Sequence, residues 1–402
     1  MTGRSMKGSQ MSRETVFSNA SIVLDDEVLL GSVQLKDGVI ADLSPASDAP
    51  GSVGEDFDGD YLLPGLVELH TDHLESHFQP RPGTHWDPIP AVLSHDAQLA
   101  GAGVTTVFDA VRIGAMGGQD DNADKAGLMI AAVSHAAEAG ILRADHFVHL
   151  RCEVAAPDTV TEFDGLGDVP AIRLASLMDH TPGQRQYADV EAFRRYMVGK
   201  GRVSAADIEA LMAERRAIAE AYSAANREAI AQRANSRGII LAAHDDATVE
   251  HVDEAHAFGV RISEFPTTEL AASRARDLGQ LIVLGAPNIV RGGSQSGNVA
   301  AADMLAKGLL DILSSDYVPF SPLQAVFRAE ADGIVSLPEA VRLVAANPAR
   351  AVGFDDRGRI ETGLRADLVR VHAHRTAPAT QHPAGVPVPV VRGVWRAGHR
   401  VA

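Results

Sequence analysis

Two kinds of hydrophobic pattern divide the chain into a middle part and two flanking parts. Between residues 61 and 357, short apolar runs alternate with longer stretches rich in helix-forming residues. Strands that alternate with helices along a chain build parallel α/β sheets. Eight runs have the length and composition of buried strands, at residues 61–72, 104–111, 147–153, 171–180, 238–246, 260–268, 281–288 and 309–316. Eight such units predict an α/β fold of the (β/α)8 TIM barrel type, which takes about 250 residues.

An open, doubly wound parallel sheet is the alternative architecture for the same pattern. Its dinucleotide-binding versions carry a G-x-G-x-x-G turn after an early strand. The sequence has no such turn after its early strands, which favours the barrel.

The flanking parts, residues 14–60 and 358–402, have a different texture, with short alternating stretches separated by turn residues. Asn19, Asp25-Asp26 and Asp37-Gly38 are hairpin signals in the first part. Neither part has enough strands to bury a core alone. We therefore expect both to join in one small β-sandwich beside a barrel over residues 61–357, with residues 1–13 as a disordered tail.

Composition narrows the possible environments and partners of the protein. The chain has 402 residues, 46% of them hydrophobic, and a formal net charge of −17. An acidic protein of this kind lacks the basic surface of a nucleic-acid binder or of a protein that docks on anionic membranes. A single cysteine, no long apolar run and no signal-peptide pattern predict a reducing, cytoplasmic location.

Metal-ligand side chains recur where the predicted strands end. Barrel enzymes carry their chemistry at the C-terminal ends of the strands, so these side chains are expected to converge on one rim. Histidine and carboxylate ligands suit zinc, manganese or a similar divalent ion, which activates water for hydrolysis. The candidates that follow strands 1, 3, 4, 5 and 8 are His70, Asp72, Glu153, His180, His244 and Asp316.

A second set of residues suggests an anionic substrate. Residues 287–298 begin at the end of the seventh strand and contain Arg291, Gly292, Gly293 and Ser294. Adjacent glycines let backbone N–H groups approach a ligand closely, and one arginine side chain can bind two phosphate oxygens at once. Three further arginines are expected near the rim, namely Arg81, Arg151 and Arg185.

The flanking β segments, the barrel, the His70-x-Asp72 motif and Asp316 together resemble the amidohydrolase superfamily. The segments ELHTDHLE, SLMDHTPGQRQ, AAHDDAT, EFPTT, GAPNIVRGGSQSGN and LLDILSSDY are similar, more closely, to its PhnM family in the carbon–phosphorus lyase pathway. That resemblance covers the chain from about residue 15 to its C-terminus. It implies hydrolysis of α-D-ribose 1-methylphosphonate 5-triphosphate to the 5-phosphate with release of diphosphate.

The resemblance also implies roles for individual residues. One or two divalent ions, zinc first with manganese or iron as alternatives, would be held by His70, Asp72, Glu153 and His244, with His180 as a further ligand. Asp316 would accept the proton of the attacking water. Barrels of this superfamily often form homo-oligomers, which leaves a homo-oligomer open here.

Two departures from the superfamily pattern leave the number of ions open. The usual first motif is His-x-His, whereas Asp72 fills its second position here. The fourth strand offers His180 where many relatives have a carbamylated lysine, and Glu153 is the candidate replacement for that bridge. The competing functions are cleavage of a cyclic amide or N-acyl bond, and a metal-free scaffold subunit.

Overall fold

A computed structural model of the protein describes most of the chain. The described residues are 14–46, 54–81, 83–115, 123–166, 168–187, 190–199, 203–204, 206–294, 297–375, 383 and 385–402. The predicted tail at residues 1–13 lies outside them, as do Gln295 and Ser296 of the glycine-rich loop.

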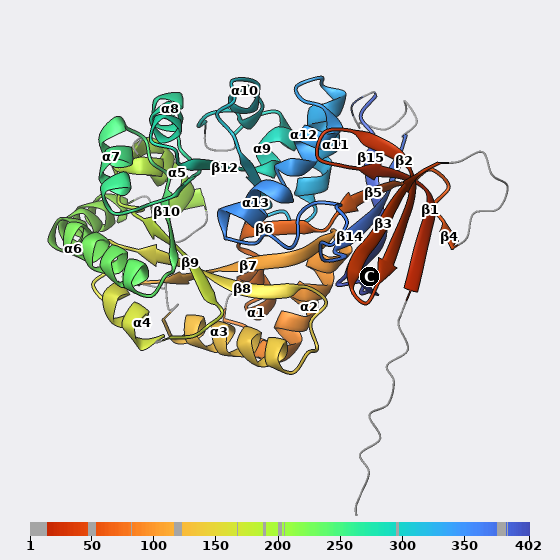
Figure 1. Ribbon diagram of the computed structural model, residues 1–402. Coiled ribbons are helices and arrows are strands. Elements are labelled where there is room, and N and C mark those ends of the chain that lie inside the picture. The colour runs from red at the N-terminus through yellow and green to blue at the C-terminus, as the bar shows by residue number, and fades with distance from the viewer. Residues whose placement is uncertain are drawn as a thin grey trace, which may run out of the picture.

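The middle of the chain forms a nearly closed parallel barrel (Figure 1). Each strand pairs with the next one along the chain, from β6 to β13. The predicted eight barrel strands are therefore confirmed. They are β6 (Leu66–Thr71), β7 (Val104–Ile113), β8 (Asp145–Glu153), β9 (Ile172–Met178), β10 (Ile240–His244), β11 (Ile262–Glu264), β12 (Leu281–Gly285) and β13 (Ile312–Ser314).

The first and last barrel strands meet where the candidate ligands lie. A parallel bridge joins Thr71 to Asp316. The backbone N–H of Asp316 donates to the backbone carbonyl of His70 over 3.0 Å. The backbone N–H of Asp72 donates to the backbone carbonyl of Asp316 over 3.1 Å. The buried Glu68 carboxylate adds a link, because it accepts the backbone N–H groups of His70 and Ser315, each over 2.7 Å. These bonds fix His70 next to Asp316.

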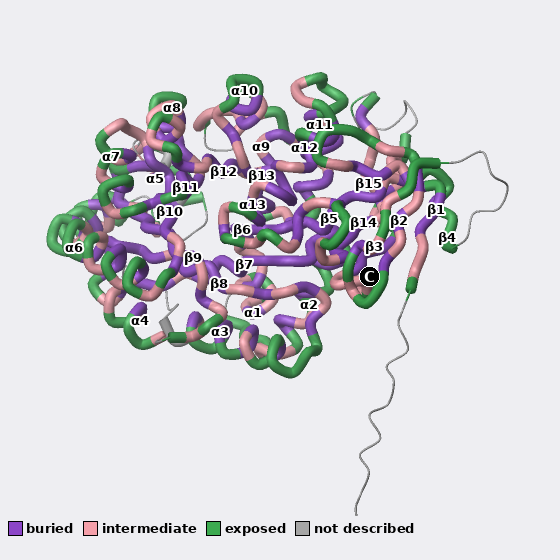
Figure 2. Tube along the Cα trace, viewed as in Figure 1, coloured by how far each residue is buried: buried purple, intermediate pink, exposed green. Residues whose placement is uncertain are grey.

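Helices surround the barrel, and the strands that they cover are the most deeply buried part of the molecule (Figure 2). Among the residues described, no helix has both the length and the apolar character needed to cross a membrane. The helices are α1 (His73–Phe78), α2 (Pro88–Gly101), α3 (Ala123–Glu138), α4 (Thr159–Gly165), α5 (Val190–Gly199), α6 (Ile208–Ser236), α7 (Val249–Ala257), α8 (Glu269–Asp277), α9 (Ala286–Arg291), α10 (Ala301–Ala306), α11 (Ser321–Ala331), α12 (Leu337–Arg342) and α13 (Ala346–Ala351).

The two ends of the chain join beside the barrel, as expected, but they build one continuous sheet where a β-sandwich was predicted (Figure 1). Its strands follow a single hydrogen-bonded path, β16-β15-β14-β5-β1-β2-β3, with β4 attached to β1. The chain leaves this sheet after Pro64 and enters the barrel at Leu66. The strands are β1 (Glu14–Val23), β2 (Val28–Lys36), β3 (Val39–Pro45), β4 (Glu55–Asp56), β5 (Tyr61–Pro64), β14 (Leu368–His374), β15 (Val388–Arg396) and β16 (His399–Arg400).

An aromatic cluster joins the N-terminal and C-terminal segments of this sheet. The Phe17 ring centroid lies 4.7 Å from that of Phe57 and 4.6 Å from that of Trp395. All three side chains are buried, and aromatic pairs at this spacing add stabilisation beyond their buried area. The predicted turns at Asp25-Asp26 and Asp37-Gly38 are present. Asn19 instead lies within β1 at a bulge, with a φ of 53° that asparagine tolerates.

The alternation of side chains along β8 decides which of its residues face the helices and which face the barrel interior. Val148, Leu150 and Cys152 pack outward against the helices. On the other face His149 lies inside the barrel, where its Nδ1 is 2.9 Å from the Leu69 carbonyl oxygen. Burial lowers the pKa of His149 to about 4, so this side chain is neutral. The next inward residue on β8 is Arg151, toward the end of the strand.

A second buried polar network lies outside the barrel, between α2 and the strands β7 and β8. His146 Nδ1 is 2.8 Å from Asp109 Oδ2, and its Nε2 is 3.3 Å from Asp96 Oδ1. Asp109 also contacts His95, and Asp96 accepts hydrogen bonds from Arg143. With two carboxylates around it, the His146 ring is held as a buried imidazolium.

This network predicts a pH-dependent contribution to stability. Burial alone would lower the pKa of His146, but Asp109 and Asp96 raise it to about 9. A raised pKa gives stability that is complete below the ordinary value and is lost as the pH rises through 9. The variant His146→Gln should therefore lose about 3 kcal/mol relative to wild type at pH 6, and less at pH 9.5. Urea unfolding of both proteins across this range measures the difference, and a constant difference would contradict the imidazolium.

Candidate metal centre

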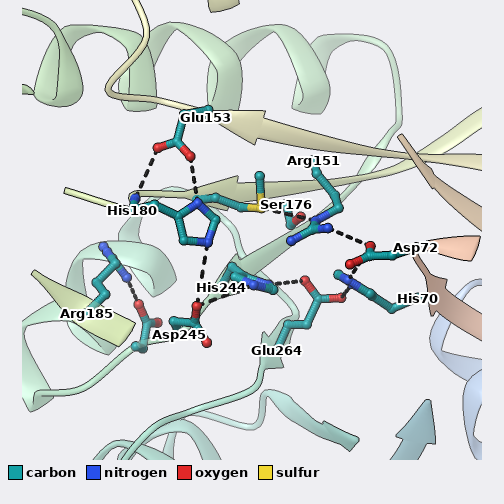
Figure 3. Close-up of polar contacts among 12 residues, drawn as sticks. His70, Asp72, Arg151, Glu153, Ser176, His180, Arg185, His244, Asp245 and Glu264 are labelled. Atoms are coloured by element: carbon teal, nitrogen blue, oxygen red, sulfur yellow. Dashed lines mark hydrogen bonds and ion pairs between the residues drawn. The ribbon is translucent and has the colours of Figure 1, made fainter. Parts of the chain in front are cut away.

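The candidate ligands gather at the C-terminal ends of the barrel strands (Figure 3). Three residues just after these ends have left-handed backbone, namely Asp245 (φ 60°), Phe265 (φ 54°) and Asp316 (φ 50°). Such backbone is costly for residues other than glycine and persists where the surrounding structure holds it, often at functional sites. The strained backbone and the candidate ligands coincide at the same rim.

One group of possible ligands consists of His180, His244 and Asp245. Asp245 Oδ2 lies 3.4 Å from His244 Nε2 and 3.9 Å from His180 Nε2. This oxygen is buried and has no hydrogen-bond partner among the residues that the structure describes. A buried carboxylate oxygen without a proton donor is costly, and a cation between the three side chains would satisfy it.

A second group consists of His70, Asp72 and Asp316, whose ligand atoms all lie within 4.8 Å of one another. His70 Nε2 is 3.5 Å from Asp72 Oδ1, the same oxygen that accepts a hydrogen bond from Arg151 over 2.5 Å. Burial raises the pKa of Asp316 to about 6, and the Asp72 carboxylate beside it adds to this rise. Two carboxylates held this close repel each other, and a divalent ion would relieve the repulsion.

Two glutamates lie behind the histidines and orient them. Glu264, at the end of β11, has one oxygen 2.8 Å from His70 Nδ1 and the other 2.8 Å from His244 Nδ1. Glu153 Oε2 lies 2.6 Å from His180 Nδ1, and Glu153 Oε1 accepts the His180 backbone N–H over 3.1 Å. Carboxylates that hold the far nitrogen of a ligating histidine are typical of metal sites.

The donor set fits divalent ions of the zinc or manganese type. Each group offers imidazole nitrogen together with carboxylate oxygen, the ligand chemistry that these ions prefer. Such an ion supplies charge that lowers the pKa of water and stabilises negative oxygen atoms. Donors of this kind, held in place from behind, support a metal centre at this rim.

The predicted anion-binding residues occupy different positions around the rim. Arg151 lies inside it, next to Asp72. Arg291 is exposed at the end of α9, and its guanidinium lies 3.4 Å from the Tyr317 hydroxyl, one residue after Asp316. Arg81 is also exposed. Arg185 is buried and forms an ion pair with Asp246, so its charge is already compensated.

The glycine-rich loop has the backbone freedom that its sequence predicts. Gly292 ends α9 with a φ of 79°, and Gly293 follows with a φ of 156°. A Cβ atom at either position would lie more than 4 Å from every described residue other than its own neighbours in the chain. The glycines therefore serve the conformation of the loop and keep its surface open, with Ser294 as the next residue.

Sequence reasoning missed Asp245 and Glu264. Asp245 lies between His244 and Asp246 and, by strict alternation, belongs to the outer face of the strand. Its left-handed backbone breaks the alternation and turns the carboxylate toward His180. Glu264 ends the sixth barrel strand, the same kind of position that singled out His70 and His244, so this signal was present.

Two sequence comparisons identify relatives of this chain. Residues 177–402 match the model of the amidohydrolase family. The chain is 44% identical over 389 residues to α-D-ribose 1-methylphosphonate 5-triphosphate diphosphatase from Escherichia coli, an alignment that covers 96% of this chain and all of that protein.

Solved structures share the fold at low sequence identity. N-acetyl-D-glucosamine-6-phosphate deacetylase from Mycobacterium smegmatis has a TM-score of 0.61 and 15% identity, covering 96% of this chain and 100% of that one. Dihydropyrimidinase from Brevibacillus agri has a TM-score of 0.59 and 13% identity, covering 96% and 95% of the two chains. Together with the barrel and its rim, the family match and the full-length relative show that the chain belongs to the amidohydrolase family.

Proposed function

We propose that this protein is a metal-dependent diphosphatase that hydrolyses α-D-ribose 1-methylphosphonate 5-triphosphate to the 5-phosphate and diphosphate. The observation that carries this proposal is the 44% identity to the Escherichia coli diphosphatase, over 96% of this chain and the whole of that protein. The dihydropyrimidinase and the deacetylase share only 13% and 15% identity with this chain, and likeness at that level supports the fold alone. A barrel with two groups of clustered ligands also counts against a metal-free scaffold.

The proposed centre holds two divalent ions, with zinc as the first candidate. His180, His244 and Asp245 would hold one ion, and His70, Asp72 and Asp316 would surround the other. In this assignment Glu153 orients His180, whereas the sequence alone suggested that it binds metal. The bound ions would activate water and stabilise charge on phosphate oxygens.

Asp316 is proposed to accept the proton of the attacking water through a carboxylate oxygen. A new P–O bond forms between the water oxygen and the phosphorus of the first phosphoryl group. The bond from that phosphorus to the oxygen that bridges it to the second group breaks, and diphosphate leaves with this oxygen. The pKa of Asp316, raised to about 6, suits proton acceptance near neutral pH, and a bound cation would lower it. Arg151, inside the rim, would help to neutralise the phosphate oxygens.

Arg291, the backbone of Gly292 and Gly293, and Ser294 are proposed to bind the departing diphosphate, with Arg81 at the edge of the site. Phosphoryl transfer depends mainly on positioning and charge neutralisation, so exposed cations at the rim have a direct role. Arg185 is proposed to hold the loop after β10 through Asp246.

A diphosphate-release assay tests the proposed function. The metal-free protein should release no diphosphate from the ribosyl triphosphate, and addition of zinc or manganese should restore release. A nucleoside triphosphate and a cyclic amide serve as comparison substrates. Metal-loaded protein that cleaves the amide and leaves the triphosphate intact would contradict the proposal.

The anion loop gives a separate prediction. Arg291→Ala should raise KM for the triphosphate about tenfold, because a charge-assisted contact with phosphate is lost, while kcat changes less. The control is Arg274→Ala, since Arg274 lies on α8 and pairs with Asp253. Steady-state kinetics of both variants measure the effect. An unchanged KM in Arg291→Ala would remove the loop from the substrate site.

A further inference from the structure

One carboxylate contacts two histidines that belong to different ligand groups (Figure 3). Glu264 Oε1 lies 2.8 Å from His70 Nδ1, and Glu264 Oε2 lies 2.8 Å from His244 Nδ1. Its carboxylate is buried, as are both rings. Both oxygens of Glu264 are thus used, one for each histidine.

The opposite nitrogens of the two rings face different groups. His70 Nε2 lies 3.5 Å from Asp72, and His244 Nε2 lies 3.4 Å from Asp245. The rings are nearly parallel, with an angle of 16° between their planes and centroids 5.5 Å apart. Phe265 contacts both rings edge-on, at 5.0 Å from His70 and 5.3 Å from His244. The rings are therefore held in one orientation from two sides.

The chemistry of a carboxylate decides where the ring protons lie. An ionised carboxylate only accepts hydrogen bonds, so each Nδ1 that contacts Glu264 must carry a proton. In a neutral imidazole the other nitrogen then has the free electron pair that binds metal. Both Nε2 atoms, one in each group, are prepared for metal binding by the same side chain.

We propose that Glu264 is a positioning residue that sets the metal-binding tautomer of both His70 and His244, one histidine in each ligand group. This inference rests on the metal-dependent part of the proposed function. It does not depend on the identity of the substrate.

The variant Glu264→Gln tests whether Glu264 acts by accepting hydrogen bonds from both rings or only through its negative charge. Its amide offers one accepting oxygen and one donating NH2 group. The oxygen can still accept from one Nδ1–H, but the NH2 group needs a free pair on the other Nδ1. That ring must place its proton on Nε2, where it blocks metal binding. We therefore expect one of the two ions to be lost, or to bind at least 10-fold more weakly, while the other remains.

The measurement is the zinc content of each protein after dialysis against buffered zinc, with affinities from chelator competition. Wild type should hold two ions per chain and Glu264→Gln one. Glu162→Gln is the matched control, because Glu162 accepts a backbone hydrogen bond from Gly114 outside the ligand groups, and it should keep two ions. Two ions at wild-type affinity in Glu264→Gln, or a parallel loss of both, would overturn the proposal.

A spectroscopic measurement on the wild type removes the dependence on a folded variant. In zinc-loaded protein with 15N-labelled histidine, His70 and His244 should both carry their proton on Nδ1. A proton on Nε2 of either ring would overturn the proposal. Wild type that holds two ions but releases no diphosphate would contradict the proposed function and leave the role of Glu264 standing.

Discussion

Replacing Asp316 with asparagine should lower kcat by about 100- to 10,000-fold, the range expected for loss of a proton acceptor. Asparagine has nearly the same shape and tolerates left-handed backbone, so the φ of 50° at this position can be kept. The bonds that join residue 316 to β6 use backbone atoms and are also kept. The loss should therefore lie in proton transfer, with the fold and the KM close to wild type.

The pH profile and the metal content show whether this explanation holds. Wild-type kcat should fall on the acid side at a pKa of about 6 or lower, since a bound cation lowers the pKa of a carboxylate. The acid limb should be absent from Asp316→Asn, because asparagine does not titrate. If the variant loses an ion together with its activity, Asp316 is primarily a ligand. Full activity would exclude it as the base.

The barrel could be predicted from the sequence because its signal is repeated. Each parallel strand is buried on both faces, so it appears as a short apolar run, and the run recurs between helices. The start of the barrel was harder to predict. The segment 61–72 reads as one strand, yet Tyr61–Pro64 belongs to the terminal sheet and Leu66–Thr71 to the barrel. Only the pairing of Tyr61–Pro64 with β14 and β1 reveals the division.

The site could be predicted as far as regular strand geometry reaches. Position at a strand end singled out His70, His244 and Asp316, and the structure brings all three to one rim. Which residues bind metal and which orient a ligand could not be predicted, because this depends on side-chain contacts between distant strands. Glu153 and His180 come from β8 and the loop after β9, and their 2.6 Å contact has no signature in the spacing of residues.

The most direct test of these roles is a comparison of Asp245→Asn with Glu153→Gln. We propose Asp245 as a ligand and Glu153 as the residue that orients His180. Loss of an orienting partner costs about 10- to 100-fold in metal affinity. Loss of a charged ligand should cost more, so Asp245→Asn should bind the ion at His180 and His244 more weakly than Glu153→Gln does. Asparagine again tolerates the left-handed backbone, here with a φ of 60°.

Zinc titration with chelator competition measures both variants against wild type, and thermal unfolding of the metal-free proteins checks that each is folded. The expected order of affinity is wild type, Glu153→Gln, then Asp245→Asn. The ion near His70 should be affected less in both variants, because neither Asp245 nor Glu153 belongs to the group formed by His70, Asp72 and Asp316. If Glu153→Gln is the weaker binder, Glu153 contacts the ion itself, as the sequence alone indicated, and the unpaired oxygen of Asp245 needs another explanation.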